Sequence, residues 1–289
     1  MKEVLDFLSR WDLALVPAVA VLAAATSYLW AVRRLAHRQP EPPWPRWRTS
    51  SFLTGLALLA FVVMGPVGAF DDELFWAHMV QHIAIMMLVA PLLLLGAPVL
   101  LALRTSGRAT RRRLLVPALR SRPVRLLTNP VLTWVLFAGA LIGTHFTPFY
   151  NYAVTHPVVH DYVEHPLYLG VALLYFYPLI GANPVPHGPS PLAKVASLVL
   201  MMGPEAMTGF FIYTARGVLY PAYAVSPRPF GLDALSDQQL GGGLMWCSGM
   251  VIGALWIAVA IQAWLRAEAR KGRRIDRQIA AGLTGPAAS

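Results

Sequence analysis

Two pairs of histidines stand four residues apart in this chain: His78 with His82, and His156 with His160. Residues four apart share one face of a helix, so each pair can present two imidazoles to the same point. Imidazole is costly to place in lipid, and a group of imidazoles at one depth of a membrane protein indicates a functional site. Because imidazole is the commonest metal ligand in proteins, the pattern predicts a metal or haem site.

The first pair lies in the segment His78-Met-Val-Gln-His82, and Met86 extends the same helical face by another turn. The spacing is that of a zinc-protease helix, but Met79 stands where the general-base glutamate of HExxH would be. Zinc proteolysis is therefore not expected. Histidine and methionine together match the ligand preference of Cu(I) better than that of zinc or magnesium.

The second pair continues to Glu164, again on one face if the segment is helical. Pro157 suits a first helical position, which places His156 at the cap. Pro166 predicts a break after His165. We therefore expect a short interfacial helix that leads into the next span.

The composition indicates a polytopic membrane protein. Of 289 residues, 56% are hydrophobic and 13% are charged, and several apolar runs reach the ~20 residues that a membrane-spanning helix needs. The formal net charge of +10 is concentrated in short segments between these runs, which is the positive-inside pattern, so we expect no nucleic-acid binding. The single cysteine, Cys247, excludes an intrachain disulfide and a CxxC metal motif.

Hydropathy predicts an all-α bundle of about seven transmembrane helices in a single domain, 1–270, followed by a disordered tail, 271–289. The expected spans are 13–33, 50–69, 76–103, 129–150, 163–183, 192–214 and 240–265. Basic residues gather in 33–48, 104–125 and 266–277, so these segments are expected on the cytoplasmic side. The N-terminus then lies outside and the C-terminus in the cytoplasm. The first run is read as a retained helix, because its basic residues follow it rather than precede it.

This topology places most of the unusual polar residues at the outer end of the bundle: His78, His82, His145, His156, His160, His165 and Asp237. His37 and His187 fall in cytoplasmic loops and are read as ordinary solvated residues. Span six contains Gly203-Pro204, which predicts a kink, and Glu205 near the middle of the membrane. Met207 is expected at about the depth of His82 and His145. Glu205 is expected to balance the charge of a cation or to carry a proton.

Several motifs resemble the CtaG family of caa3-type cytochrome c oxidase assembly factors. They are His78-Met-Val-Gln-His82, Ala90 to Pro98, His156 to Pro166 with Tyr168-Leu-Gly170, and Asp237-Gln-Gln-Leu-Gly-Gly-Gly-Leu-Met-Trp246. The resemblance spans roughly 50–265. It implies a multi-pass protein of the bacterial plasma membrane that is needed to mature a haem-copper oxidase, plausibly by handling copper. The family's histidine motifs carry over onto His78, His82, His156, His160 and His165, and its acidic motif onto Asp237.

The resulting hypothesis is a non-enzymatic membrane protein that binds Cu(I) transiently near its outer face and passes it to an oxidase subunit. Binding would begin at the exposed second group and continue to His78, His82 and His145, with Met207 involved and Asp237 near the opening. The expected partners are cytochrome c oxidase subunits, extracytoplasmic copper chaperones and the lipid bilayer. Two alternatives remain open: a haem b redox protein with His82 and His145 as axial ligands, and a metal-free docking scaffold for oxidase subunits.

Overall fold

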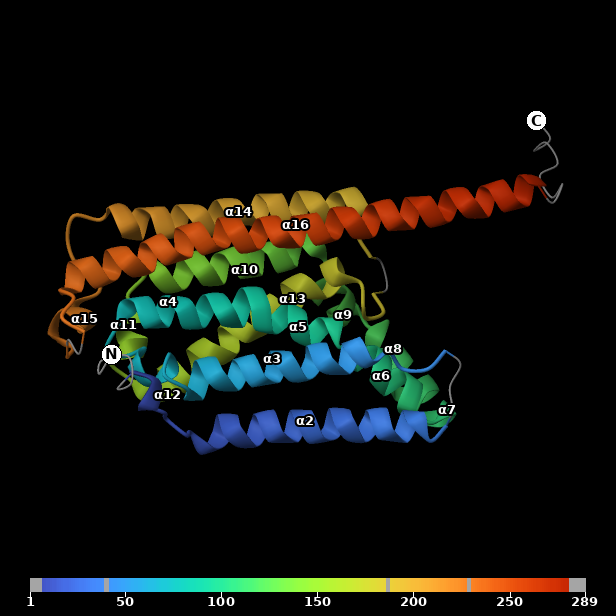
Figure 1. Cartoon of the computed structure of the whole chain (residues 1–289), viewed down its shortest axis with the longest axis horizontal. Coiled ribbons are helices and arrows are strands. Elements are labelled where there is room, and N and C mark those ends of the chain that lie inside the picture. Colours follow the sequence, from blue (N-terminus) through green and yellow to red (C-terminus); the bar gives the residue numbers. More distant parts are fainter. Residues whose placement is uncertain (1–6, 39–41, 186–187, 228–229, 281–289) are drawn as a thin grey trace.

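The fold is a bundle of long helices, described here from a computed structural model that covers residues 7–38, 42–185, 188–227 and 230–280. These residues form helices and no strands, so the predicted all-α class is confirmed. The helices that run along the bundle (Figure 1) are α2 (Leu15–Ala36), α3 (Arg46–Met64), α4 (Phe75–Ala84) continued by η2 (Ile85–Val89), α5 (Ala90–Leu95) and α6 (Pro98–Thr105), α10 (Pro130–His145), α12 (Pro157–Val159) continued by η4 (His160–Glu164) and α13 (His165–Ile180), α14 (Pro191–Thr214), and α16 (Ala234–Ala280).

Six of these segments are long and apolar enough to cross a membrane, whereas seven were predicted. The remaining segment, Pro130–His145, is an apolar helix of 16 residues, slightly shorter than the usual ~17–25 residues of a span. The short elements lie in the connections: η1 (Gly68–Phe70), α7 (Arg108–Thr110), η3 (Arg111–Leu115), α8 (Val116–Leu119), α9 (Arg122–Leu127), α11 (Phe149–Val154) and α15 (Pro221–Val225).

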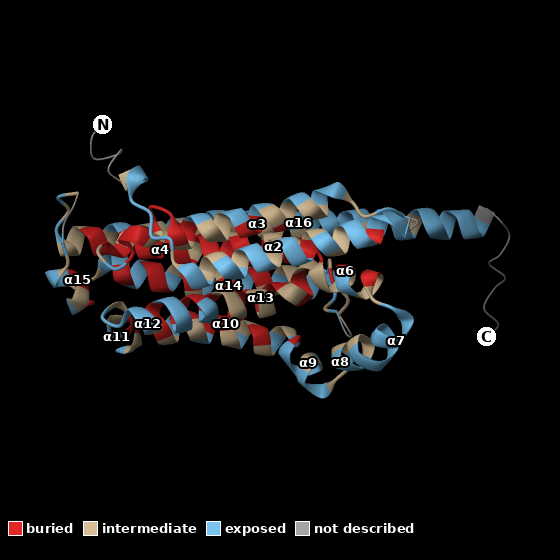
Figure 2. Ribbon diagram, turned by 90° about the horizontal axis from the view of Figure 1, so that it is seen from below, coloured by how far each residue is buried: buried red, intermediate tan, exposed pale blue. Residues whose placement is uncertain are grey.

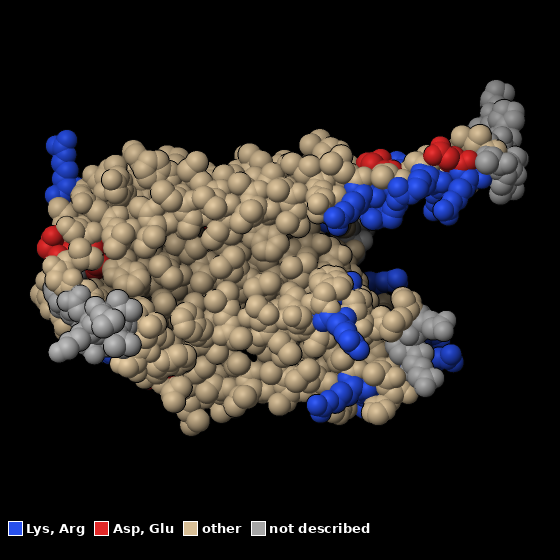
Figure 3. Space-filling model, in the orientation of Figure 1, with Lys and Arg blue, Asp and Glu red and all other residues tan. Residues whose placement is uncertain are grey.

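Charged residues separate between the two ends of the bundle. Figure 3 shows most lysines and arginines at the end where α16 projects, although α16 also carries acidic residues there; the opposite end has a small acidic group with some basic side-chain atoms nearby. The middle of the face seen in Figure 3 shows neither kind of charge. The prediction that the acidic end of the bundle lies outside the membrane and the basic end in the cytoplasm depends on this distribution.

The last helix is longer than expected. α16 runs for 47 residues and continues past Gly272 to Ala280. The structure thus describes 271–280 as helix, where a disordered tail was predicted. Its final part projects beyond the bundle (Figure 1). Alanine, arginine, lysine and glutamate dominate this part of the sequence, and all four are strong helix formers. The rest of the predicted tail, 281–289, lies outside the described residues.

Three π-helical turns, η2, η3 and η4, each end two residues before a proline: Pro91, Pro117 and Pro166. In each, the residue before the proline donates its N–H to the carbonyl five residues back, as His165 does to His160. A proline in a helix lacks an N–H and collides with the carbonyl four residues earlier, and a wider turn accommodates both defects. The predicted break after His165 is therefore wrong, because η4 lets the helix pass through Pro166 without interruption.

The helix that begins with α4 is the most deeply buried of the spans. Figure 2 shows the buried residues gathered along the inside of the bundle and the exposed ones on its outer faces. Many exposed side chains are large and apolar, for example Leu200 and Val251, as expected where lipid surrounds the protein. The polar residues of α4 are consequently held among neighbouring helices.

Close contact between α14 and α16 depends on glycine. A Cβ atom on Gly209 would lie 2.8 Å from the carbonyl oxygen of Gly242, on backbone that cannot move aside. Glycine pairs of this kind let membrane helices approach backbone to backbone. α14 also remains one helix through Gly203-Pro204.

We predict that Gly209→Ala lowers the free energy of unfolding by about 1–3 kcal/mol, because the added methyl group forces the two helices apart. Gly203→Ala, in the same helix, is the matched control, since a Cβ there meets no atom of the described residues within 4 Å. The control should be neutral or stabilising by up to about 1 kcal/mol. Thermal unfolding of both variants in detergent measures the difference, and equal melting temperatures would contradict the prediction.

Candidate metal centre

Three histidines meet inside the acidic end of the bundle. His78 and His82 project from α4, and His145 is the last residue of α10. One ring nitrogen from each lies within 4.8 Å of the others, and all three side chains are buried. Nitrogen ligands of a tetrahedral ion lie about 3.3 Å apart, given metal–nitrogen bonds near 2.0 Å. A small contraction would therefore let this group, the histidine triad, hold one ion.

Hydrogen bonding leaves the triad nitrogens free to bind. His145 Nδ1 lies 2.8 Å from the Leu141 carbonyl oxygen, which can only accept, so Nδ1 carries the proton and Nε2 keeps its lone pair. Among the described residues, that Nε2, both ring nitrogens of His78 and Nδ1 of His82 have no hydrogen-bond partner. The fourth soft atom is nearby, since the Met79 sulfur lies 3.2 Å from His82 Nε2.

A second buried group adjoins the triad and contains carboxylates. His160 lies between Glu164 and Asp71, with Nδ1 2.8 Å from Glu164 Oε2 and Nε2 3.2 Å from Asp71 Oδ2. Asp71, His160 and His165 together offer three ligand atoms within 4.8 Å. A third set, His78, His160 and Glu164, joins this carboxylate group to the triad. The three sets overlap, so the centre is continuous.

The π-turn η4 builds the carboxylate group. A π-turn is wider than an α-turn, and here the rings of His160 and His165, five residues apart, meet edge to face with centroids 4.7 Å apart. Gln81 of α4 fixes His165: its amide nitrogen donates to the Val62 carbonyl, so its oxygen accepts from His165 Nε2 at 2.7 Å. The Nδ1 atom of His165 is left with its lone pair.

Tyrosines close the centre on several sides. The Tyr168 hydroxyl lies 3.0 Å from Glu164 Oε1 and 2.9 Å from Thr144 Oγ1, which connects the carboxylate group to the neighbour of His145. Tyr223 donates to the Asp71 carbonyl oxygen, so Tyr150 must donate to Tyr223 across 2.7 Å. Burial raises the pKa of both the Tyr150 and the Tyr223 phenols, which keeps them neutral donors.

Asp237 has a positioning role that the sequence did not reveal. Its carboxylate is buried and accepts the backbone N–H groups of Phe75 and Trp76 at 2.9 and 3.0 Å. It therefore caps the first turn of α4 from the start of α16, and its two oxygens are directed at backbone rather than at the histidines. That Asp237 also lies near the opening of the site stays a prediction.

Two predicted ligands lie away from the centre. His156 is exposed, bonds through Nδ1 to the Tyr152 carbonyl oxygen at 2.8 Å and stacks on the Tyr152 ring. Met207 is 56% exposed on the outer face of α14, because a residue two positions from the buried Glu205 faces the opposite side of a helix. The structure brings neither side chain to the triad.

Two other predicted residues line a small cavity beside the triad. Met86 and Glu205 are both buried there, and His82 contributes to the same wall. His37 follows α2 at the basic end, and His187 lies outside the described residues.

Three groups that complete the centre were not predicted as ligands from the sequence. Asp71 was not singled out, Glu164 was noted only as an extension of the second histidine pair, and Met79 only as the residue in place of a catalytic glutamate. A signal existed for Glu164, which follows His160 at the helical spacing of four. Nothing local distinguished Asp71 from its neighbour Asp72.

The geometry does not suit a haem between His82 and His145. Their ring centroids are 5.2 Å apart, and the adjoining cavity measures about 10 Å³. Pockets for large ligands usually exceed about 300 Å³. The space beside these two rings is therefore far smaller than a macrocycle needs.

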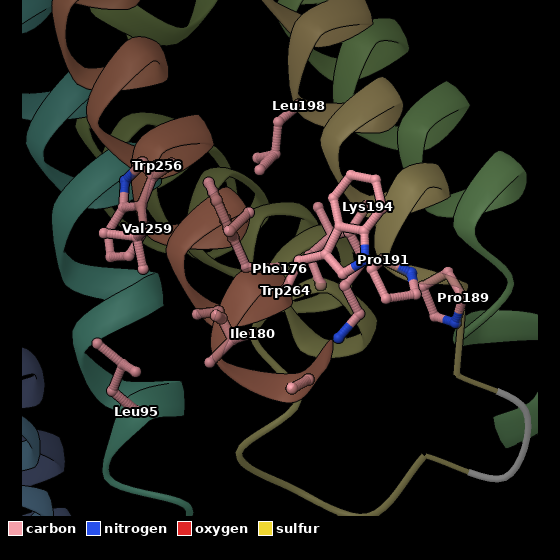
Figure 4. Close-up of a pocket in the computed structure, with 14 residues that line it drawn as sticks. Leu95, Phe176, Ile180, Pro189, Pro191, Lys194, Leu198, Trp256, Val259 and Trp264 are labelled. Carbon is pink, nitrogen blue, oxygen red and sulfur yellow. The ribbon is translucent and has the colours of Figure 1, made fainter. Parts of the chain in front are cut away.

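A larger pocket lies at the opposite, basic end of the bundle. It measures about 230 Å³ and is lined by apolar residues of α13, α14 and α16 with Lys194 among them (Figure 4). The described residues that line it include no histidine and no carboxylate. It is separate from the candidate metal centre.

The fold and the centre together define a polytopic helical membrane protein with buried histidine and carboxylate side chains at one end. The sequence profile of the cytochrome c oxidase caa3 assembly factors (Caa3_CtaG) matches residues 26–267, and the chain belongs to this family. The predicted family is thereby confirmed. Assembly of cytochrome c oxidase is the role for which the family is named.

Curated relatives from mycobacteria carry no more specific description. Proteins of Mycobacterium bovis and Mycobacterium tuberculosis, both named as uncharacterized, are each 29% identical over 275 residues, which is 93% of this chain and 41% of theirs. An uncharacterized protein of Mycobacterium leprae is 26% identical over 283 residues, 95% of this chain and 42% of its own. The chain thus spans about two fifths of the length of these relatives. No solved structure matches it.

The capping role of Asp237 can be tested by substitution. We predict that Asp237→Ala lowers the free energy of unfolding by about 1–3 kcal/mol, because two buried N–H groups at the start of α4 lose a charged acceptor. Asp276→Ala, on the exposed part of α16, is the control and should stay within about 0.5 kcal/mol of the parent. Thermal unfolding in detergent compares them. Equal stability would show that Asp237 does not anchor α4.

Proposed function

We propose that this protein binds copper(I) near the outer face of the bacterial plasma membrane and delivers it to subunits of cytochrome c oxidase during assembly. Copper is cargo here, and the protein acts as a carrier rather than as an enzyme. The observation that carries the proposal is the histidine triad, whose ligand atoms lie within 4.8 Å of one another in a buried site.

The free nitrogens argue against a purely structural role for the triad. A buried polar atom without a hydrogen-bond partner costs about 1–3 kcal/mol, and several such atoms meet at this point, within the part of the chain that the structure describes. A fold that used these histidines only for packing would be more stable with apolar residues in their place. Binding of a metal ion would satisfy one nitrogen on each of the three rings at once.

The donor set favours copper(I) among the common metals. Three imidazoles suit copper, and the Met79 thioether, 3.2 Å from His82 Nε2, adds a soft ligand that favours copper(I) over zinc. A monovalent ion also brings less charge into an apolar interior than a divalent one does. Neither ligand type carries a fixed negative charge, so the ion can leave again.

The carboxylate group supports a path from the outer surface to the triad. Asp71 precedes α4 in the acidic connection, and its set with His160 and His165 overlaps the set of His78, His160 and Glu164. His78 in turn belongs to the triad. An ion that enters at Asp71 can therefore change ligands one at a time. A copper chaperone outside the membrane is the expected donor.

The double variant His78→Ala, His82→Ala tests this proposal. We predict that it weakens copper(I) binding by more than about 100-fold, the upper range for loss of a single outer-shell partner, because two direct ligands disappear. His156→Ala is the matched control, since that ring is exposed and away from the triad. The measurement is a copper(I) titration of detergent-purified protein under reducing conditions, together with oxidase activity in cells.

Unchanged copper binding and unchanged oxidase maturation in the double variant would refute the proposal. Persistent association with oxidase subunits, without copper binding in the parent protein, would instead favour the docking scaffold.

A further inference from the structure

A small cavity lies beside the triad, toward the middle of the bundle, where α4, η2, α10, α14 and α16 meet. Its volume is about 10 Å³, which is room for one water molecule or one ion. The residues that line it are His82, Ile83, Met86, Met87, Leu141, Glu205, Met245 and Gly249. The cavity adjoins the histidine triad, because His82 belongs to both.

Among the described residues that line this cavity, Glu205 supplies the only carboxylate. The side chain is 5% exposed, and its Oε2 atom has no hydrogen-bond partner among the described residues. An ionised carboxylate inside a membrane bundle needs a compensating positive charge. The described part of the wall offers no lysine or arginine, so a bound cation is the natural partner.

The other groups of the wall select the kind of cation. Three methionines and one histidine surround the space, and thioether and imidazole ligands favour copper(I) over hard ions such as sodium or magnesium. Copper(I) and one carboxylate also sum to zero charge, which suits an apolar surrounding.

Local backbone features hold these side chains around the cavity. Met86 and Met87 are consecutive residues of the π-turn η2, and π-turns often occur at functional sites because they redirect neighbouring side chains. Gly249 lets α16 approach Glu205: a Cβ atom there would lie 3.2 Å from Glu205 Cβ and 3.3 Å from its Oε2. Glycine at this position therefore leaves room for the carboxylate.

We propose that this cavity is a second copper(I) site, held by Met86, Met87 and Met245, with Glu205 as the counter-charge. The one lone pair of neutral His82 binds in the triad when both sites are filled, and in the cavity while an ion passes between them. The inference rests on copper(I) being the cargo of the triad and adds a position deeper in the membrane. His82 is common to both sites, so an ion can pass from the triad to the cavity without losing all of its ligands.

The test counts copper(I) bound by the full-length protein in detergent under anaerobic, reducing conditions. The parent should bind two ions per chain. Met86→Leu, Met245→Leu removes thioethers while keeping nearly the same volume, and it should bind one. His78→Ala, His145→Ala leaves His82 in place and should also bind one, with X-ray absorption showing mainly sulfur around the copper. The combined variant should bind none.

Met207→Leu, Met250→Leu is the matched control, because both thioethers are exposed, by 56% and 47%. It should bind two ions like the parent. Glu205→Gln should weaken copper(I) binding at the cavity only, which is the site that remains in the His78→Ala, His145→Ala variant.

The outcomes separate the two proposals. If Met86→Leu, Met245→Leu binds as many ions as the parent, with the same affinities, the cavity holds water only and the triad proposal stands. If Met86→Leu, Met245→Leu abolishes copper binding while His78→Ala, His145→Ala binds as much copper as the parent, the triad proposal fails and the cavity proposal stands. A parent that binds no copper(I) overturns both.

Discussion

The centre depends on one buried interaction, in which the Asp237 carboxylate accepts the first N–H groups of α4. A helix begins with unpaired N–H groups, and here they lie inside protein, where water cannot satisfy them. The carboxylate comes from the start of α16, so the chain's last span determines where α4 begins. His78 and His82 follow within two turns of that point. The depth and rotation of both rings are therefore set by a residue that is distant in sequence.

Prolines determine the rest of the geometry through the π-turns that precede them. An uninterrupted α-helix across 157–180 would rotate His165 away from His160 by more than a quarter of a turn. The wider turn forced by Pro166 instead brings both rings and Glu164 to one side. The same device before Pro91 places Met86 and Met87 beside Glu205. The π-turns that accommodate the prolines thus point these side chains in directions that a regular α-helix would not allow.

Much of the fold could be predicted from the sequence, because lipid imposes length and apolarity on every span. The segment expected at 192–214 is the helix Pro191–Thr214, and His78 and His82 do share one helical face. The depth of a residue in the membrane does not reveal which way its side chain faces around the helix axis. Glu205 and Met207 lie at nearly the same depth, yet one is buried and the other faces outward. His156 does not join His160 at the centre for a different reason: Pro157 starts a new helix, and His156 precedes it.

The arrangement of ligands changes steadily along the path that we propose. Near the acidic surface the groups contain carboxylates, which attract cations from water. The triad has neutral nitrogens, and the cavity beyond it has thioethers with one carboxylate. Each step replaces hard ligands by softer ones and retains one residue of the previous set: His160, then His78, then His82. A cation that is strongly hydrated gains little by moving inward along such a series, whereas a soft monovalent ion loses water easily and gains better ligands. The gradient therefore discriminates by the chemistry of the ion as well as by its charge.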